Sequence, residues 1–194
     1  MFLIYKICAK IIKLYLGIFK QLKISGQENI PSEGPVIIVA NHISAWDPPV
    51  VAVACPRQVH FMAKHELFTN PLLRWVFTKL GAFPVKRHVP DRKAYKYALT
   101  ILRDNRVLGM FPEGTRSKSG ELNPAEQGAA LLALRTQATL IPAGIKGTRY
   151  KDTGPVQIRF GQQVPWSDLD PKDRASNRVL AERIMHHIAR LLTD

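Results

Sequence analysis

Short apolar runs alternate with longer amphipathic stretches along most of the chain, and this alternation is typical of a buried sheet covered by helices. The apolar runs predict strands at 35–40, 59–63, 83–85, 107–111, 140–145 and 156–160. The amphipathic stretches predict helices at 47–54, 65–80, 91–103, 124–136 and 172–192. The pattern therefore predicts an α/β fold class, a single domain with a central, mostly buried sheet flanked by helices.

Two of the predicted helices carry further expectations. Asp47 precedes two prolines, so we expect it to be an N-cap with the prolines in the first turn. The segment 65–80 holds many large apolar residues for so short a region, and we expect it to pack in the core.

The first 24 residues form an amphipathic pattern of their own. At 100° per residue, Lys6, Lys10, Lys13 and Lys20 fall within about 80° of arc, and most of the remaining surface is apolar. No apolar run exceeds six residues before a lysine, which argues against a spanning helix, and no cleavage site of a signal peptide follows. We expect residues 1–24 to lie on an anionic membrane surface, ahead of a domain at 25–194. The alternative is a helix that packs its apolar face on the core.

Composition narrows the setting. With 194 residues and 46% hydrophobic residues, the chain has enough material for one sizeable core. Its two cysteines, Cys8 and Cys55, have neither disulfide-framework nor metal-ligand spacing and favour a reducing compartment. The expected location is the cytoplasmic face of the cell membrane, as a peripheral or monotopic protein.

The formal net charge is +13, and it is unevenly distributed. Residues 1–27 contain five lysines and no acid, while residues 57–103 contain ten Lys or Arg against two acids. Such a surface suits anionic lipid, a polyanionic substrate or nucleic acid. Aromatic residues are concentrated in apolar segments rather than interleaved with the basic ones, so nucleic acid is not an expected partner.

Two motifs carry candidate chemistry. His42 is followed five residues later by Asp47, and residues 111–117 read Phe-Pro-Glu-Gly-Thr-Arg-Ser. An imidazole can take a proton from a hydroxyl while a carboxylate orients it, and an arginine fork beside a glycine turn can hold a phosphate. By spacing alone, however, an ordinary loop histidine beside a capping aspartate and an ordinary strand-to-turn connection remain open alternatives.

The motifs also carry a resemblance. Residues 41–47 match the N-H-x-x-x-x-D signature of glycerolipid acyltransferases, and 111–117 match their F-P-E-G-T-R-S block. Residues 81–87 resemble the family's second block and 140–144 its fourth, in the family's order. Over roughly residues 22–165 the chain resembles the 1-acylglycerol-3-phosphate acyltransferases.

The resemblance implies that an acyl group passes directly from acyl-CoA or acyl carrier protein to lysophosphatidic acid, giving phosphatidic acid. It implies that His42 is the general base and Asp47 its partner. Beyond this pair, it implies a set of substrate-binding residues, which comprises Lys86, Arg87, Glu113, Gly114, Thr115 and Arg116. Among these, Arg87 and Arg116 would bind phosphate, Gly114 would allow close approach, and Glu113 would contact a glycerol hydroxyl or order the arginine. Part of 65–80 could line an acyl slot.

Other chemistries find little support in the sequence. It contains no G-x-S-x-G elbow, P-loop or H-E-x-x-H pattern, so we expect no covalent intermediate, no metal and no cofactor. The rival reactions are acylation of glycerol 3-phosphate or of another lysophospholipid, and hydrolysis of the thioester. A basic membrane- or nucleic-acid-binding module without catalysis is a more remote alternative, because it leaves the four ordered blocks unexplained.

Overall fold

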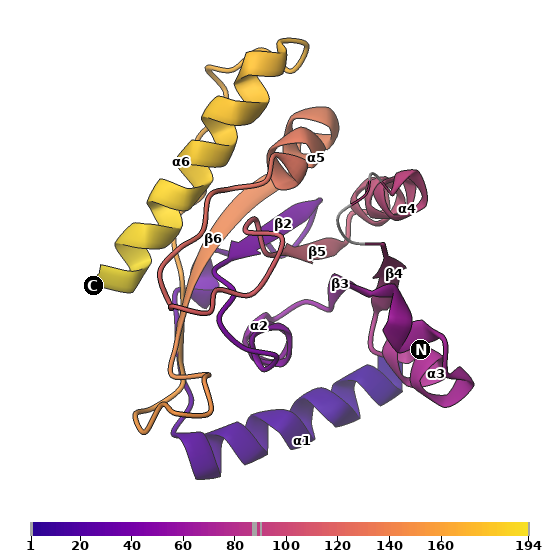
Figure 1. Cartoon of the computed structure of the whole chain (residues 1–194), viewed down its shortest axis with the longest axis vertical. Coiled ribbons are helices and arrows are strands. Elements are labelled where there is room, and N and C mark those ends of the chain that lie inside the picture. The colour runs from indigo at the N-terminus through magenta and orange to yellow at the C-terminus, as the bar shows by residue number, and fades with distance from the viewer. Residues whose placement is uncertain (1, 87–88, 90, 194) are drawn as a thin grey trace.

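The computed structural model describes residues 2–86, 89 and 91–193 and shows a seven-stranded sheet between two layers of helices (Figure 1). The strands are β1 Lys23–Ser25, β2 Val36–Ala40, β3 Val59–Lys64, β4 Ala82–Val85, β5 Val107–Met110, β6 Thr139–Lys146 and β7 Gln157–Phe160. The α-helices are α1 Phe2–Lys20, α2 Asp47–Ala54, α3 Pro71–Lys79, α4 Arg92–Arg103, α5 Gly128–Thr136 and α6 Arg174–Thr193. Two short 3-10 helices span Gln27–Asn29 and His65–Phe68.

The strands are ordered β1-β7-β6-β2-β5-β3-β4 across the sheet. The five strands from β6 to β4 are parallel, whereas β7 pairs with β6 antiparallel and β1 pairs with β7 in parallel. The central strand β2 is buried at every position, as its β-branched sequence predicts for a strand covered on both faces. The predicted α/β fold class is confirmed.

Two separate clusters of buried side chains fill the spaces on either side of the sheet. One joins β2 and β5 to α4, α5 and α6, and the other joins the opposite side of the same strands to α1 and α2. The buried side chains of α1 include Tyr5 and Leu16. The alternative expectation for the first segment, packing on the core, therefore holds for one narrow side of α1.

Three predicted boundaries or environments are wrong. The first helix ends at Lys20 rather than residue 24, because Lys23–Ser25 pairs with β7 as a strand. Helix α5 begins at Gly128 rather than residue 124, because the Glu126 N–H donates to the carbonyl oxygen of Pro112 instead of entering a helix. Helix α3 contains no buried residue, although Phe68 just before it is buried. Helix α3 directly precedes β4, which is the last strand at one edge of the sheet.

Candidate active site

The two motifs meet at the carboxyl edge of the sheet. His42 follows β2, and Glu113 follows β5, which pairs with β2 in parallel. From β2 the chain crosses toward β3, and from β5 it crosses to β6 on the other side of β2. Connections that leave neighbouring strands in opposite directions open a crevice at their carboxyl ends. The strand order therefore brings segments 71 residues apart into contact.

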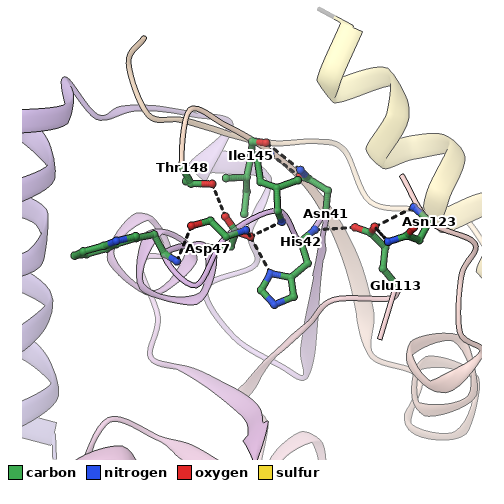
Figure 2. A network of polar contacts seen from close by, with 10 residues as sticks. Asn41, His42, Asp47, Glu113, Asn123, Ile145 and Thr148 are labelled. Carbon is green, nitrogen blue, oxygen red and sulfur yellow. Dashed lines mark hydrogen bonds and ion pairs between the residues drawn. The ribbon is translucent and has the colours of Figure 1, made fainter. Parts of the chain in front are cut away.

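His42 and Asp47 form a buried hydrogen-bonded pair (Figure 2). The Nδ1 atom of His42 lies 2.8 Å from Oδ2 of Asp47, and the Asp47 side chain is fully buried. Because a carboxylate oxygen accepts, the Nδ1 atom donates, so in the neutral ring the lone pair lies on Nε2. Among the described residues, none hydrogen-bonds Nε2, which leaves this atom available to a substrate.

Asp47 is held by the loop that precedes it. Its Oδ2 atom also accepts from the backbone N–H groups of Ile43 and Ser44, each at 2.7 Å. The predicted N-cap role is wrong, because the N-cap of α2 is Trp46 and the Asp47 carboxylate binds amides before the helix rather than inside it. A buried carboxylate with several donors is fixed in position. Asp47 therefore fixes the orientation of the His42 ring.

Thr148 supplies the remaining contact of Asp47. Its hydroxyl Oγ1 donates to Oδ1 of Asp47 at 2.6 Å, and the residue is buried. The chain turns toward Asp47 at Gly147, where φ is +76° and a Cβ would lie 2.2 Å from the carbonyl oxygen of Pro155. The sequence reasoning missed Thr148, although a Gly-Thr pair directly after a buried strand is the available signal.

Asn41 fixes the backbone just before His42. Its Nδ2 donates to the carbonyl oxygen of Ile145 at 3.0 Å, and its Oδ1 accepts from the Ile145 N–H at 2.8 Å. These two bonds extend the pairing of β2 with β6 by a side chain. The motif contains Asn41, but its role emerges only from the neighbouring strand.

The 111–117 loop holds both backbone groups of His42. The His42 N–H donates to Oε1 of Glu113 at 2.7 Å, and the His42 carbonyl oxygen accepts from the Ser117 N–H at 2.7 Å. The other oxygen of Glu113, Oε2, accepts from the backbone N–H and Nδ2 of Asn123. The described partners of Glu113 are thus His42 and Asn123 rather than Arg116. The structure assigns this carboxylate to holding loops together, which differs from the expectation that it orders the arginine.

Phe111 supports the imidazole from one side. The two rings are stacked with centroids 4.1 Å apart and an interplanar angle of 21°. Phe61 on β3 stacks in turn on Phe111, with centroids 6.1 Å apart. The His42 ring is therefore held by packing as well as by hydrogen bonds.

The predicted substrate-binding residues are only partly brought to this site. Gly114 has φ of +68° in the turn closed by its N–H and the Phe111 carbonyl oxygen, and Thr115 and Arg116 follow it as exposed residues. Lys86 is exposed after β4, two strands away from β5, and its N–H donates to Asp91. Arg87 lies outside the described residues.

Comparison with known proteins agrees with the motifs and the fold. A family model described as Acyltransferase matches residues 21–146. The 1-acyl-sn-glycerol-3-phosphate acyltransferase of Bacillus subtilis is 34% identical over 190 residues, which cover 93% of this chain and 94% of that protein. The protein of the same name from Streptococcus pneumoniae is 34% identical, over 84% of this chain and 63% of its own length.

A solved structure shows the same architecture. The crystal structure of the LPA acyltransferase PlsC from Thermotoga maritima superposes with a TM-score of 0.78 at 28% identity, over 96% of this chain and 77% of that one. The α/β fold of this chain is thus shared with an LPA acyltransferase. The chain belongs to the Acyltransferase family.

Proposed function

We propose that this chain transfers a fatty acyl group from an acyl thioester to the free hydroxyl of 1-acyl-sn-glycerol 3-phosphate, giving phosphatidic acid. The observation that carries the proposal is the His42–Asp47 pair, whose ring Nε2 has no hydrogen-bond partner among the described residues. The names of the relatives from Bacillus subtilis and Streptococcus pneumoniae support the same acceptor.

The reaction follows from the orientation of the ring. Nε2 of His42 takes the proton of the acceptor hydroxyl while that oxygen adds to the thioester carbonyl carbon. Asp47 stabilises the imidazolium through the Nδ1–H bond. Collapse of the adduct breaks the carbon–sulfur bond, and the proton on Nε2 passes to the departing thiolate. The products are the ester and a free thiol, and His42 returns to its neutral form.

The phosphate of the acceptor is assigned to the exposed residues of the same loop. Arg116 offers two parallel N–H donors, Thr115 a hydroxyl, and Gly114 a turn without a side chain. Lys86 and Arg87 are proposed as further phosphate ligands from the resemblance of their block. Glu113 supports this loop through its hydrogen bonds to His42 and Asn123, and its proposed contact with a glycerol hydroxyl comes from the resemblance of its block.

The donor is acyl-CoA or an acyl carrier protein, and no cofactor is needed for the transfer. Both donors are polyanionic, and the net charge of +13 suits either.

The proposed location is the cytoplasmic face of the cell membrane. In the part of the chain that the structure describes, no helix is long and apolar enough to cross a bilayer. Lys6, Lys10 and Lys13 are exposed on α1, and Lys20 is half-buried at its end. These four lysines are proposed to face anionic headgroups, with α1 lying in the plane of the interface.

A panel of acceptors tests the proposed function. Purified protein is incubated with one donor, either acyl-CoA or the acylated form of acyl carrier protein. The acceptor is lysophosphatidate, glycerol 3-phosphate, a lysophosphatidylcholine or monoacylglycerol, and ester and free thiol are measured together. We expect phosphatidate with equimolar thiol, and at least about a tenfold preference over monoacylglycerol, because Arg116 binds the phosphate. Arg116→Ala should reduce that preference. Thiol release without ester would indicate a hydrolase, and a better yield from another acceptor would reassign the substrate.

A further inference from the structure

Helix α1 exposes an apolar stripe that faces away from its own protein. Its buried residues Tyr5 and Leu16 lie on one side of the helix. At 100° per residue, the opposite side carries five large apolar residues, each 50–70% exposed, which are Leu3, Ile7, Ile11, Leu14 and Ile18. The exposed lysines lie on one flank between these two sides, and Tyr15 and Phe19 lie on the other. The aromatic flank is therefore a distinct feature of α1.

Helix α3 exposes a second apolar group beside α1. Leu72, Leu73 and Trp75 are 69%, 42% and 52% exposed, and no residue of the helix is buried. Helix α3 contacts α1, and Figure 1 shows it beside the N-terminal part of that helix. Isolated exposed apolar residues need no explanation, but a group on two adjoining helices marks an interaction surface.

Trp46 connects this surface to the catalytic loop. It lies between His42 and Asp47 in the sequence and is 44% exposed. Its ring stacks on the ring of Tyr15 on α1, with centroids 5.8 Å apart and an interplanar angle of 18°. The ring of Tyr15 in turn packs against that of Phe19, with centroids 5.2 Å apart. The aromatic flank of α1 is thus in direct contact with the loop that holds the base.

We propose that α3 and Trp46 complete, with the outer stripe of α1, one surface that docks on an anionic bilayer, and that the Trp46–Tyr15 contact holds the catalytic loop at the edge of that surface. This inference rests on the proposed function, because its acceptor is an amphiphile whose acyl chain resides in a bilayer. The lysolipid then reaches His42 along the aromatic flank without crossing water.

Charge and residue type favour a bilayer over a protein partner. Residues 1–27 contain no acid, so the exposed Lys10 and Lys13 flank the apolar stripe without a counter-charge on their own helix. Anionic headgroups supply that charge, and aliphatic side chains enter the acyl boundary beneath them. Trp and Tyr prefer the level of the headgroups, which matches their position at the edge rather than the centre of the stripe.

Flotation with phosphatidylglycerol vesicles tests the contribution of α3. We expect full-length Leu72→Ser/Leu73→Ser to bind at least about tenfold more weakly than the wild type, because two exposed leucines no longer enter the bilayer. The matched control is Leu131→Ser/Val179→Ser, which removes two exposed aliphatic side chains from α5 and α6 on the other face and should bind as the wild type. Equal binding by the α3 variant would overturn the proposal. A wild-type dimer that dissociates in the α3 variant would also overturn it, since the surface would then join two copies.

The role of Trp46 is tested by how the acceptor is presented. Lysophosphatidate in phosphatidylglycerol vesicles is compared with a short-chain, monodisperse lysophosphatidate. For each protein we divide kcat/KM for the vesicle-bound acceptor by kcat/KM for the monodisperse acceptor. In Trp46→Ala we expect this ratio to fall about fivefold or more, and Trp46→Phe should restore it by keeping a stacking ring. An unchanged ratio in Trp46→Ala would contradict the coupling. If the wild type converted neither acceptor, the proposed function would fail, while the flotation result would still decide whether the surface docks.

Discussion

At the scale of single residues, the site depends on a hydroxyl that no motif includes. Thr148 donates to the Asp47 oxygen that does not contact His42, across 101 residues of sequence. The three other donors to Asp47 all reach Oδ2. Without Thr148, Oδ1 would be a buried carboxylate oxygen with no described donor. Thr148 is therefore a positioning residue, which acts on His42 through Asp47.

Replacing this hydroxyl tests its role. Thr148→Val keeps the shape of the side chain, and we expect kcat to fall about tenfold or more while KM changes little, because a bond to a charged group is lost. Thr148→Ser should recover most of the activity. The NMR chemical shift of the His42 Nδ1 proton should change in the valine variant and return to the wild-type value in the serine variant. Wild-type kcat in Thr148→Val would contradict the assignment.

The contacts that the sequence could not predict share one physical cause. His42 and Asp47 are five residues apart, so a short loop brings them together and their pairing is accessible to sequence reasoning. Asn41 and Thr148 act through partners more than a hundred residues away, and these pairings depend on β6 lying beside β2. Periodicity predicts a strand but not its neighbour in the sheet.

At the scale of elements, the apolar runs predicted the strands well and the environment of α3 badly. The β-branched run of β2 is typical of a strand covered on both faces, and β6, predicted from a mixed apolar run, is likewise buried along most of its length. A nine-residue amphipathic helix fits a core and an exposed surface equally well. Strand β1 was missed because three residues after a helix give no periodic signal.

Strand β3 provides a pH-dependent contribution to stability. His60 on this strand is buried, and its Nδ1–H donates to the carbonyl oxygen of Gly81 at 3.1 Å. Burial lowers the pKa of His60 below its ordinary value of 6.5, because the charged ring loses its hydration, although the Gly81 bond opposes this. Protonation therefore favours the unfolded chain. This contribution is fully present above pH 6.5 and is lost as the pH falls toward the lowered pKa.

Denaturant unfolding of His60→Asn checks that sign. Below pH 6.5 we expect the free energy of unfolding of the wild type to fall more steeply than that of the variant, by at most about 1.4 kcal/mol per pH unit. His65→Asn, at an exposed position, should follow the wild type. Parallel curves for the wild type and His60→Asn would contradict the account.

At the scale of the whole molecule, the charge is arranged by face. On one face of the protein, the exposed lysines of α1 lie beside the exposed apolar residues of the same helix. The helices on the opposite side of the sheet also carry exposed basic residues, such as Lys93 and Lys96 on α4. Both faces are basic, so net charge alone does not distinguish them. Membrane binding by α1 requires the position of its lysines beside an apolar stripe.

Neutralising matched pairs of lysines separates position from net charge. Lys10→Gln/Lys13→Gln should weaken binding to phosphatidylglycerol vesicles by about fivefold per lysine at low salt, and the difference should shrink at high salt. Lys93→Gln/Lys96→Gln removes the same charge from α4 and should have a much smaller effect. Equal weakening by both pairs would indicate attraction by total charge and would remove the assigned role of α1.

The catalytic activity of His42→Ala is the measurement that tests the central claim most directly. The variant keeps the backbone bonds of residue 42 to Glu113 and Ser117, so we expect it to fold with nearly the unfolding midpoint of the wild type. Positioned proton transfer contributes about 10² to 10⁴ in rate, and conversion of lysophosphatidate to phosphatidate should fall by at least about a hundredfold. A folded His42→Ala protein that forms phosphatidate at the wild-type rate would contradict the account.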